Sequence, residues 1–143
     1  MKPFFFSFLL VSLIAGSALA ESSNQQVAAR SRGFELVGAF ANDGYKIRDS
    51  HWFGKLEKGK DLFIEVNLYV GNSYWFALAS DTDTTKLGVT AFDEAGNELE
   101  ANLFAENGRA AVGITPSFSG PCYIRLQLLE GSSSDVCLLY CYK

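Results

Sequence analysis

The stretch Leu62-Phe63-Ile64-Glu65-Val66-Asn67-Leu68-Tyr69-Val70 decides the fold class, because its side chains alternate in character. Aliphatic residues occupy every even position, and aromatic or polar residues occupy every odd one. A period of two is typical of an extended strand, in which successive side chains point to opposite faces. One face of this strand is therefore expected in a core, and the other outside it.

Seven further short runs accompany this strand, each bounded by Gly, Pro, Asn or Asp, at residues 45–56, 73–80, 86–93, 97–105, 109–115, 121–130 and 133–142. Regularly spaced short strands of this kind predict an all-β domain. Their core-phase rows, stacked as two sheets about 10 Å apart, would form a sandwich core. We therefore expect a jelly-roll-like two-sheet β-sandwich of about eight strands over residues 45–143. The core-phase residues are Tyr74, Phe76, Leu78; Leu87, Val89, Ala91; Leu99, Ala101, Leu103; Ala110, Val112, Ile114; and Ile124, Leu126, Leu128, Leu139.

The first twenty residues have the pattern of a secretory signal peptide. Lys2 precedes an apolar run over residues 4–15, and the small residues Ala18 and Ala20 precede the expected cleavage site. The apolar run is shorter than the roughly 20 residues that a membrane-spanning helix needs. We therefore expect residues 1–20 to be removed and the product to be secreted or periplasmic, without membrane association.

A short helix is expected between this leader and the first strand, in a segment over residues 21–44. Val27, Phe34, Val37 and Ala41 recur at spacings of seven, three and four, which is a helical period. Gly33 and Gly38 each weaken this helix by about 1 kcal/mol relative to alanine, so a break at Gly33 is an alternative. The turn residues Asn42-Asp43-Gly44 would end the helix.

Composition bounds the size and the partners of the protein. The chain has 143 residues, 48% of them hydrophobic, with 12 Lys and Arg against 16 Asp and Glu. Its length predicts a single domain beyond the leader. A formal net charge of −4 provides no basic surface for a phosphate backbone, so nucleic acid is not an expected partner.

Three cysteines, Cys122, Cys137 and Cys141, lie in the last two runs, and export would permit a disulfide. Cys137 and Cys141 lie about 13 Å apart along one strand, too far for a bridge. A two-residue type II′ turn at Gly131-Ser132 would pair the runs as a hairpin with Cys122 opposite Cys141. We therefore predict a Cys122–Cys141 disulfide and a buried free thiol at Cys137, although a longer turn would shift this register.

Aromatic side chains on the outward phase of their strands suggest a binding surface. If Tyr74 and Phe76 face inward, Trp75 faces outward, and the same phase holds for Phe53, Phe63, Tyr69 and Phe92. Exposed aromatic rings offer a large rigid apolar area to sugar rings or protein partners. We select Trp75, Phe53 and Tyr69 as candidate ligand-binding residues.

A structural role is the alternative for these aromatic residues, because an N-terminal helix needs a surface to cover. The predicted hairpin places Tyr123 opposite Tyr140, with Tyr142 beside them. We expect the helix to cover these tyrosines before it covers Trp75.

Two loops carry oxygen ligands that suit a hard cation. Asp81 and Asp83 alternate in the loop 81–85, and Asp93, Glu94 and Asn97 form a second oxygen-rich turn. Calcium takes six to eight oxygens, and neither loop holds that number. Asp81 and Asp83 are nevertheless the best candidate Ca²⁺ ligands, because alternate carboxylates in a loop can present oxygens to the ion alongside backbone carbonyls. Ordinary Asx-rich turns are the alternative interpretation, and no other cofactor is expected.

Catalytic motifs are sparse in this sequence. His51 is the single histidine, and it follows Asp49-Ser50 directly. Neighbours on a strand point to opposite faces, so this run cannot form a catalytic relay by itself. We expect His51 to be a surface strand residue, and we expect no enzymatic activity.

Turn glycines and alternating apolar residues recur in a fixed order: Trp52-x-Gly54-x-Leu56-x-x-Gly59, Gly71-Asn72-x-Tyr74-x-Phe76, Leu87-x-Val89-x-Ala91-Phe92-Asp93-x-x-Gly96-Asn97, and Ser119-Gly120-x-x-Tyr123-x-Arg125. Over about residues 45–142, this order resembles the bacterial pre-peptidase C-terminal (PPC) domain. That family is a small jelly-roll-like sandwich appended to secreted proteases and other exported enzymes. The resemblance implies a stand-alone binding or accessory module. Several family members bind calcium and some bind collagen or carbohydrate, but Asp81 and Asp83 are displaced from the family's usual Asp-Leu-Asp-Leu arrangement.

The leading functional hypothesis is a secreted, non-enzymatic binding or accessory module for carbohydrate or a protein surface. An envelope structural or interaction protein, or a protease inhibitor, is the alternative. An exported hydrolase comes third.

Overall fold

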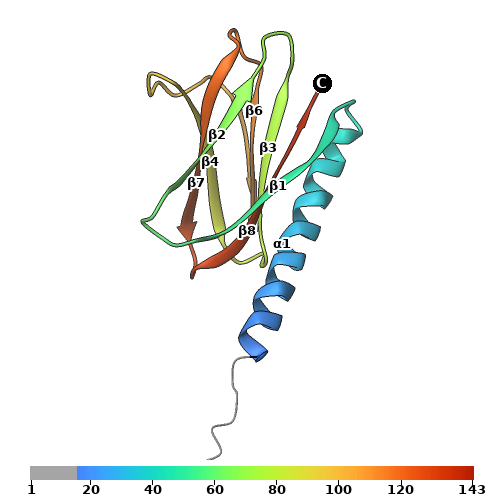
Figure 1. Cartoon of the computed structure of the whole chain (residues 1–143), viewed down its shortest axis with the longest axis vertical. Helices are drawn as coiled ribbons and strands as arrows, with labels where there is room; N and C mark the ends of the chain where they lie inside the picture. The colour runs from blue at the N-terminus through green and yellow to red at the C-terminus, as the bar shows by residue number, and fades with distance from the viewer. Residues whose placement is uncertain (1–15) are drawn as a thin grey trace, which may run out of the picture.

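The computed structural model describes residues 16–143, with side chains from Asn24 onward except that of Asp49. Over this range one helix precedes eight strands, which confirms the all-β sandwich expected from the sequence (Figure 1). The elements are α1 (Gly16–Ala41), β1 (Lys46–Leu56), β2 (Leu62–Leu68), β3 (Tyr74–Ser80), β4 (Lys86–Asp93), β5 (Asn102–Glu106), β6 (Arg109–Ile114), β7 (Gly120–Glu130) and β8 (Ser134–Tyr142).

The strands form two antiparallel sheets of unequal size. One sheet has five strands in the order β1-β8-β3-β6-β5, and the other has three in the order β2-β7-β4. β1 pairs with β8, β2 with β7 and β3 with β6, so the two halves of the chain are nested as in a jelly roll. The main core lies between the sheets and is built mostly from the residues predicted to face inward, among them Phe76, Leu78, Val112, Ile124 and Leu126. The prediction is wrong for Leu139, which points to the other face of its sheet and packs beneath α1.

A second, smaller core lies between α1 and the outer face of the five-stranded sheet. On the sheet side it consists of small or compact residues, Ala77, Ala111, Cys137 and Leu139. On the helix side it consists of Ala29, Leu36 and Val37, with Phe40 partly buried against it. Figure 1 shows α1 running along this side of the sandwich, with its N-terminal turns extending past the ends of the strands.

Close packing explains which side of the helix faces the sheet. A Cβ atom at the buried Gly33 would lie only 2.9 Å from Leu139 Cδ1, so glycine lets the helix approach closely. The helix is continuous through Gly33, so the alternative of a break there is wrong. The expected helix face is correct for Val37 but wrong for Val27 and Phe34, which are 65% and 37% exposed, and for Ala41, which is exposed as well.

Hydrogen bonds from α1 fasten it to the strand ends. Arg32 Nε donates to the carbonyl oxygen of Ser80 at 3.0 Å, and Arg32 Nη2 donates to the carbonyl oxygen of Asn107. Arg109 pairs with Glu35 on the same helix. These contacts hold α1 to the end of β3 and to the β5–β6 turn.

The fifth strand is shorter and starts later than its pattern predicts. Leu99 and Ala101 lie in the segment that crosses from β4 to β5, where both pack partly against the main core. Leu103 in β5 is 65% exposed, so the expectation that it faces a filled core is wrong. The reason is the size of the opposite sheet, whose three strands do not reach under the edge of the five-stranded sheet.

The predicted C-terminal hairpin is wrong. β7 pairs with β2 and β4, whereas β8 pairs with β1 and β3, so the connection at Gly131-Ser132 passes from one sheet to the other. Gly131 has a φ of +119°, which an L side chain rarely adopts. The glycine thus marks a turn, but the turn joins sheets and not paired strands.

Residues 1–15 of the predicted leader lie outside the residues that the structure describes. Helix α1 begins at Gly16 and so runs through the position expected for cleavage after Ala20. Among the described residues, no helix is both long and apolar enough to cross a bilayer.

Candidate functional site

The outer face of the three-stranded sheet is the sheet surface that α1 leaves open, because α1 packs on the other sheet (Figure 1). The register places Phe63 beside Arg125 and Arg125 beside Thr90 in one row. The next row contains Glu65, Tyr123 and Phe92. We call these six residues the aromatic face.

Alternation along the strands creates this surface. In β7 the even residues from Cys122 to Leu128 are buried in the main core, and Tyr123, Arg125 and Gln127 point the other way. In β2 the exposed positions fall on Phe63, Glu65 and Asn67 for the same reason. The outward side chains therefore stand on a rigid sheet whose opposite face is fixed by the core.

The rings of the aromatic face contact one another above the middle strand. The ring centroids of Phe63 and Phe92 lie 6.3 Å apart with a tilt of 55°. The guanidinium carbon of Arg125 lies 5.0 Å from the centroid of Phe92, within cation–π range. Arg125 Nε also donates to Thr90 Oγ1 at 3.0 Å, which fixes its orientation.

Exposure and neighbouring polar groups complete the surface. Phe63 is 57% exposed, and Phe92 and Tyr123 are half-buried. Beside them Gln127 Nε2 donates to Asp61 Oδ2 at 3.1 Å. A hollow of about 250 Å³ opens at the end of β4 and the start of β7, lined by Asp93, Glu94, Ala95, Phe118, Ser119, Gly120 and Pro121. Rings and planar polar side chains are thus displayed together on one open surface.

Trp75 has a structural role in the described fold. Its ring stacks on Phe40 of α1, with centroids 4.4 Å apart and planes 6° from parallel. On its other side, a Cβ atom at Gly113 would lie 2.7 Å from the Trp75 ring, so the ring lies directly over this glycine. The expectation that the helix covers the hairpin tyrosines before Trp75 is therefore wrong.

The structure does not bring the three predicted ligand-binding aromatics together. Phe53 packs partly against the core beneath α1, on the same side as Trp75. Tyr69 follows β2 in the other sheet and is 60% exposed. Phe63 and Phe92 were on the outward phase of the sequence pattern as well, but the sequence does not say which sheet the helix covers.

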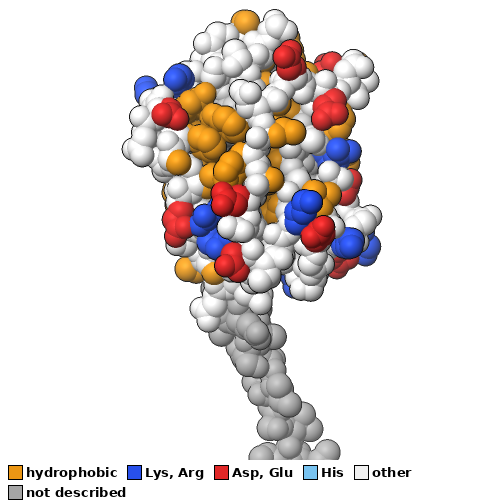
Figure 2. Space-filling model, turned by 180° about the vertical axis from the view of Figure 1, so that it is seen from behind, with side chains coloured by type: hydrophobic (Ala, Val, Ile, Leu, Met, Phe, Trp, Pro, Cys, Tyr) orange, Lys and Arg blue, Asp and Glu red, His pale blue; other side chains and the backbone are white. Residues whose placement is uncertain are grey.

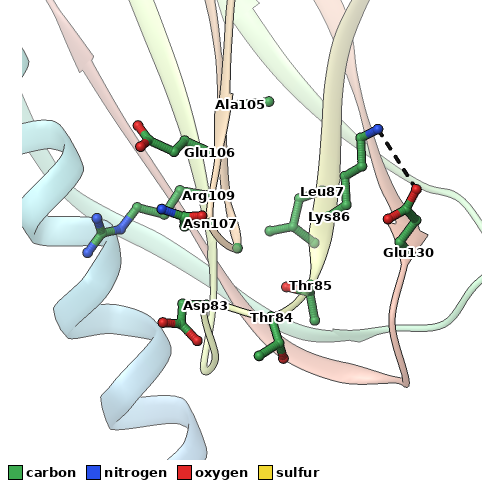
Figure 3. A pocket seen from close by; sticks show the side chains of 11 residues that line it. Asp83, Thr84, Thr85, Lys86, Leu87, Ala105, Glu106, Asn107, Arg109 and Glu130 are labelled. Atoms are coloured by element: carbon green, nitrogen blue, oxygen red, sulfur yellow. Dashed lines mark ion pairs between the residues drawn. The ribbon is translucent and has the colours of Figure 1, made fainter.

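Asp81 and Asp83 lie in the β3–β4 loop but differ in surroundings. Burial is the main cause that raises the pKa of the Asp81 carboxyl, and the charge of Asp135 raises it further. Asp83 is exposed and lies at the foot of a pocket of about 340 Å³ between β4 and the β5–β6 turn (Figure 3). Among the described side chains, no three His, Cys, Asp or Glu groups are arranged to hold a metal ion.

Two basic side chains of this pocket form ion pairs with carboxylates on neighbouring elements. Lys86 Nζ lies 4.0 Å from Glu130 Oε1, and the Arg109 side chain points toward α1, where it meets Glu35 (Figure 3).

On the side opposite to the view of Figure 1, hydrophobic side chains gather over the middle of the surface, with basic and acidic groups interspersed around them (Figure 2). The visible charges therefore form no single-sign field on that side.

In the second oxygen-rich turn, the carboxylate of Asp93 accepts hydrogen bonds from backbone amides of the same turn. Asp93 Oδ1 accepts hydrogen bonds from the Ala95 and Asn97 amides at 3.0 and 2.8 Å. Asn97 Nδ2 donates to Asp93 Oδ2 at 3.2 Å. These bonds, led by that of the Asn97 amide, lower the pKa of Asp93. The geometry is that of an Asx turn.

The predicted Cys122–Cys141 disulfide is wrong, and all three cysteines are free and buried. Cys122 lies in the main core between the sheets. Cys141 lies in β8 of the five-stranded sheet, with its Sγ 3.9 Å from the Trp75 carbonyl oxygen. Cys137 packs beneath α1 beside Leu139, as expected for a buried thiol. Burial raises the pKa of each thiol to about 11.

His51 lies exposed on β1, as expected, with its ring edge-on to Phe53 at a centroid distance of 4.8 Å.

The chain matches none of the known protein-family models and none of the curated proteins with which it was compared. The resemblance to the PPC domain therefore remains a prediction from the sequence pattern.

Proposed function

We propose that this protein is an exported, non-enzymatic accessory module that binds polysaccharide through its aromatic face. The observation that carries the proposal is the position of Phe63, Phe92 and Tyr123, which lie together on the sheet surface that α1 leaves open. The aromatic face takes the place of the residues selected from the sequence, two of which face the helix.

The chemistry of the aromatic face suits a sugar chain. Aromatic rings provide flat apolar area at low entropic cost, which matches the C–H faces of pyranose rings. Planar polar groups from Arg125, Gln127 and Asp61 lie beside these rings and could hydrogen-bond sugar hydroxyls. A site of this kind combines apolar contact with a few oriented polar groups.

Two sequence features support export and an accessory role. The leader pattern of residues 1–20 suits secretion or the periplasm. The resemblance to the PPC domain over residues 45–142 suits a module that acts beside an exported enzyme. A protein surface is the competing ligand, since aromatic residues are also enriched at protein interfaces.

Co-sedimentation with insoluble cellulose, chitin and peptidoglycan tests this proposal. We expect saturable retention on at least one of them, and a loss of about tenfold or more in affinity for Phe63→Ala, equivalent to about 1.4 kcal/mol. Leu103→Ala is the matched control, because Leu103 is similarly exposed but lies in β5 of the other sheet.

Equal retention of the Phe63→Ala and Leu103→Ala variants would overturn the assignment of the site. Absence of retention on every polysaccharide would overturn the ligand class and favour a protein partner. Circular dichroism of both variants controls for folding.

A further inference from the structure

The sandwich is open along the edge where β1 of one sheet faces β2 of the other. Both are terminal strands of their sheets, and they do not pair with each other. Ile64 and Val66 lie on the core phase of β2 but stay half exposed. They line a hollow of about 160 Å³, together with Ser50, His51, Trp52, Leu138 and Tyr140. The floor of this hollow is therefore mostly apolar and is built from both sheets.

An irregularity in β1 places polar side chains at the mouth of this hollow. Ile47 lies opposite Cys141 and His51 opposite Leu139, so four residues of β1 advance against two of β8. The extra residues form a bulge that carries Arg48 and Ser50. Bulges on edge strands re-aim side chains and occur often beside functional sites.

Both bulge residues turn toward Tyr140. Arg48 Nε donates to the Tyr140 hydroxyl oxygen at 3.3 Å, and the guanidinium carbon lies 5.7 Å from the centroid of the Tyr140 ring and 5.3 Å from that of Tyr142. Burial would raise the pKa of Tyr140, but hydrogen bonds from Arg48 and Ser50 outweigh it and lower that pKa.

Among the described side chains, no carboxylate forms an ion pair with Arg48. The guanidinium is oriented by Tyr140 and Tyr142 instead. Arg48 also lines a second hollow of about 350 Å³, with Ile47, Ser50 and Tyr142. Ser50 lines both hollows, so the apolar hollow and the guanidinium adjoin. An oriented guanidinium beside an apolar hollow is complementary to a molecule with a carboxylate at one end and an apolar body at the other.

We propose that this open edge binds a small arylcarboxylate, with one aromatic ring in the hollow and the carboxylate on Arg48. Size limits the ring count, because a cavity of about 150 Å³ in another protein holds one benzene molecule. Trp52, Ile64 and Leu138 contact the ring. The carboxylate accepts from the terminal nitrogens of Arg48 and from the Ser50 hydroxyl. This site lies on the inner side of β2, opposite the aromatic face.

Isothermal titration calorimetry of the full chain with phenylacetate tests the proposal. We expect saturable binding with a dissociation constant of about 1 mM or tighter. Phenylacetamide has the same shape without the charge, and we expect it to bind at least about tenfold more weakly. Arg48→Gln should weaken phenylacetate binding by a similar factor. Arg125→Gln is the matched control, since Arg125 also lies over an aromatic ring but on the aromatic face.

Three results would each overturn this proposal: no saturation up to about 10 mM phenylacetate, equal affinity for the acid and the amide, or an unchanged affinity in a folded Arg48→Gln variant. If that variant does not fold by circular dichroism, the comparison of acid and amide on the unaltered chain decides. Unchanged binding in Arg125→Gln separates this site from the polysaccharide surface.

Discussion

Trp75 is clamped between a glycine of the sheet and a ring of the helix. Gly113 leaves the space on one side, and Phe40 stacks on the other. A side chain at residue 113 would therefore push the indole away from its place and disturb the contact with α1. Trp75, which the sequence pattern places on an outward face, thus contributes to the stability of the fold through its packing.

We expect Gly113→Ala to lower the free energy of unfolding by about 1–3 kcal/mol, because the added methyl group overpacks the Trp75 contact. Gly88→Ala is the matched control on a strand of the other sheet. Its nearest neighbour would be Leu129 Cδ1 at 3.2 Å, and Leu129 is exposed and able to move. Urea denaturation should show a change below about 1 kcal/mol for the control. Equal effects of the two substitutions would contradict the clamp.

The three buried thiols predict a loss of stability at alkaline pH. Their pKa in the folded protein is about 11, against about 8.5 for an unfolded cysteine. The folded chain therefore holds these protons more strongly, and this contribution to stability is complete below about pH 8.5 and falls as the pH rises toward 11. Replacement of Cys137 with alanine should reduce the slope of stability against pH over this range.

A thiol reagent checks the same three residues directly. At pH 8 the folded protein should react slowly with 5,5′-dithiobis(2-nitrobenzoic acid), and the unfolded protein should release three equivalents without prior reduction. Release of a single equivalent from the unreduced, unfolded chain would show a disulfide and contradict the arrangement of the cysteines.

Helix α1 contains two glycines in different environments. A comparison of alanine substitutions at the two positions therefore distinguishes the effect of packing against the sheet from the effect of helix propensity. Gly33 faces the sheet against Leu139, whereas a Cβ atom at Gly38 would meet no atom within 4 Å. Both substitutions with alanine gain the same intrinsic propensity, about 1 kcal/mol. We expect Gly38→Ala to stabilise the protein by up to about 1 kcal/mol and Gly33→Ala to be clearly less stable than Gly38→Ala. Thermal or urea unfolding measures this difference, and equal stabilisation by both would contradict close docking of α1.

The positions of the strands could be predicted because each has an alternating pattern and a bounded length. The pairing of β7 with β8 could not, because a glycine turn between alternating strands suits a hairpin and a crossover between sheets equally well. A signal for the helix-covered sheet was present: β3 and β8 are apolar at nearly every position, as strands buried on both faces are. That signal would have placed Trp75 and Cys141 beneath a covering element.

The candidate site was predictable only in part, for a related reason. Alternation assigns Phe63, Phe92 and Trp75 to outward faces, but a face is open only if no other element covers it. Coverage depends on how α1 docks, and the small residues Ala77 and Ala111 that receive it do not stand out in the sequence. Arg125 and Thr90 meet only because β4 pairs with β7, and the sequence pattern does not predict which strands pair.

At the scale of the whole molecule, the helix makes the two sides of the sandwich different. The five-stranded sheet is buried on both faces over its centre, and the three-stranded sheet keeps its outer face for contact with other molecules. The proposed polysaccharide surface depends on this asymmetry. If α1 covered the other sheet, Trp75 would be open and Phe63 would be buried.

Hydroxyl-radical footprinting of the folded chain, read out by mass spectrometry, tests this asymmetry most directly. We predict rapid modification of Phe63 and Tyr69, and slow modification of Trp75 and Cys137 despite the high intrinsic reactivity of indole and thiol groups. Unfolding in urea should remove the protection of Trp75 and Cys137. Rapid modification of Trp75 together with protection of Phe63 in the folded chain would contradict the account.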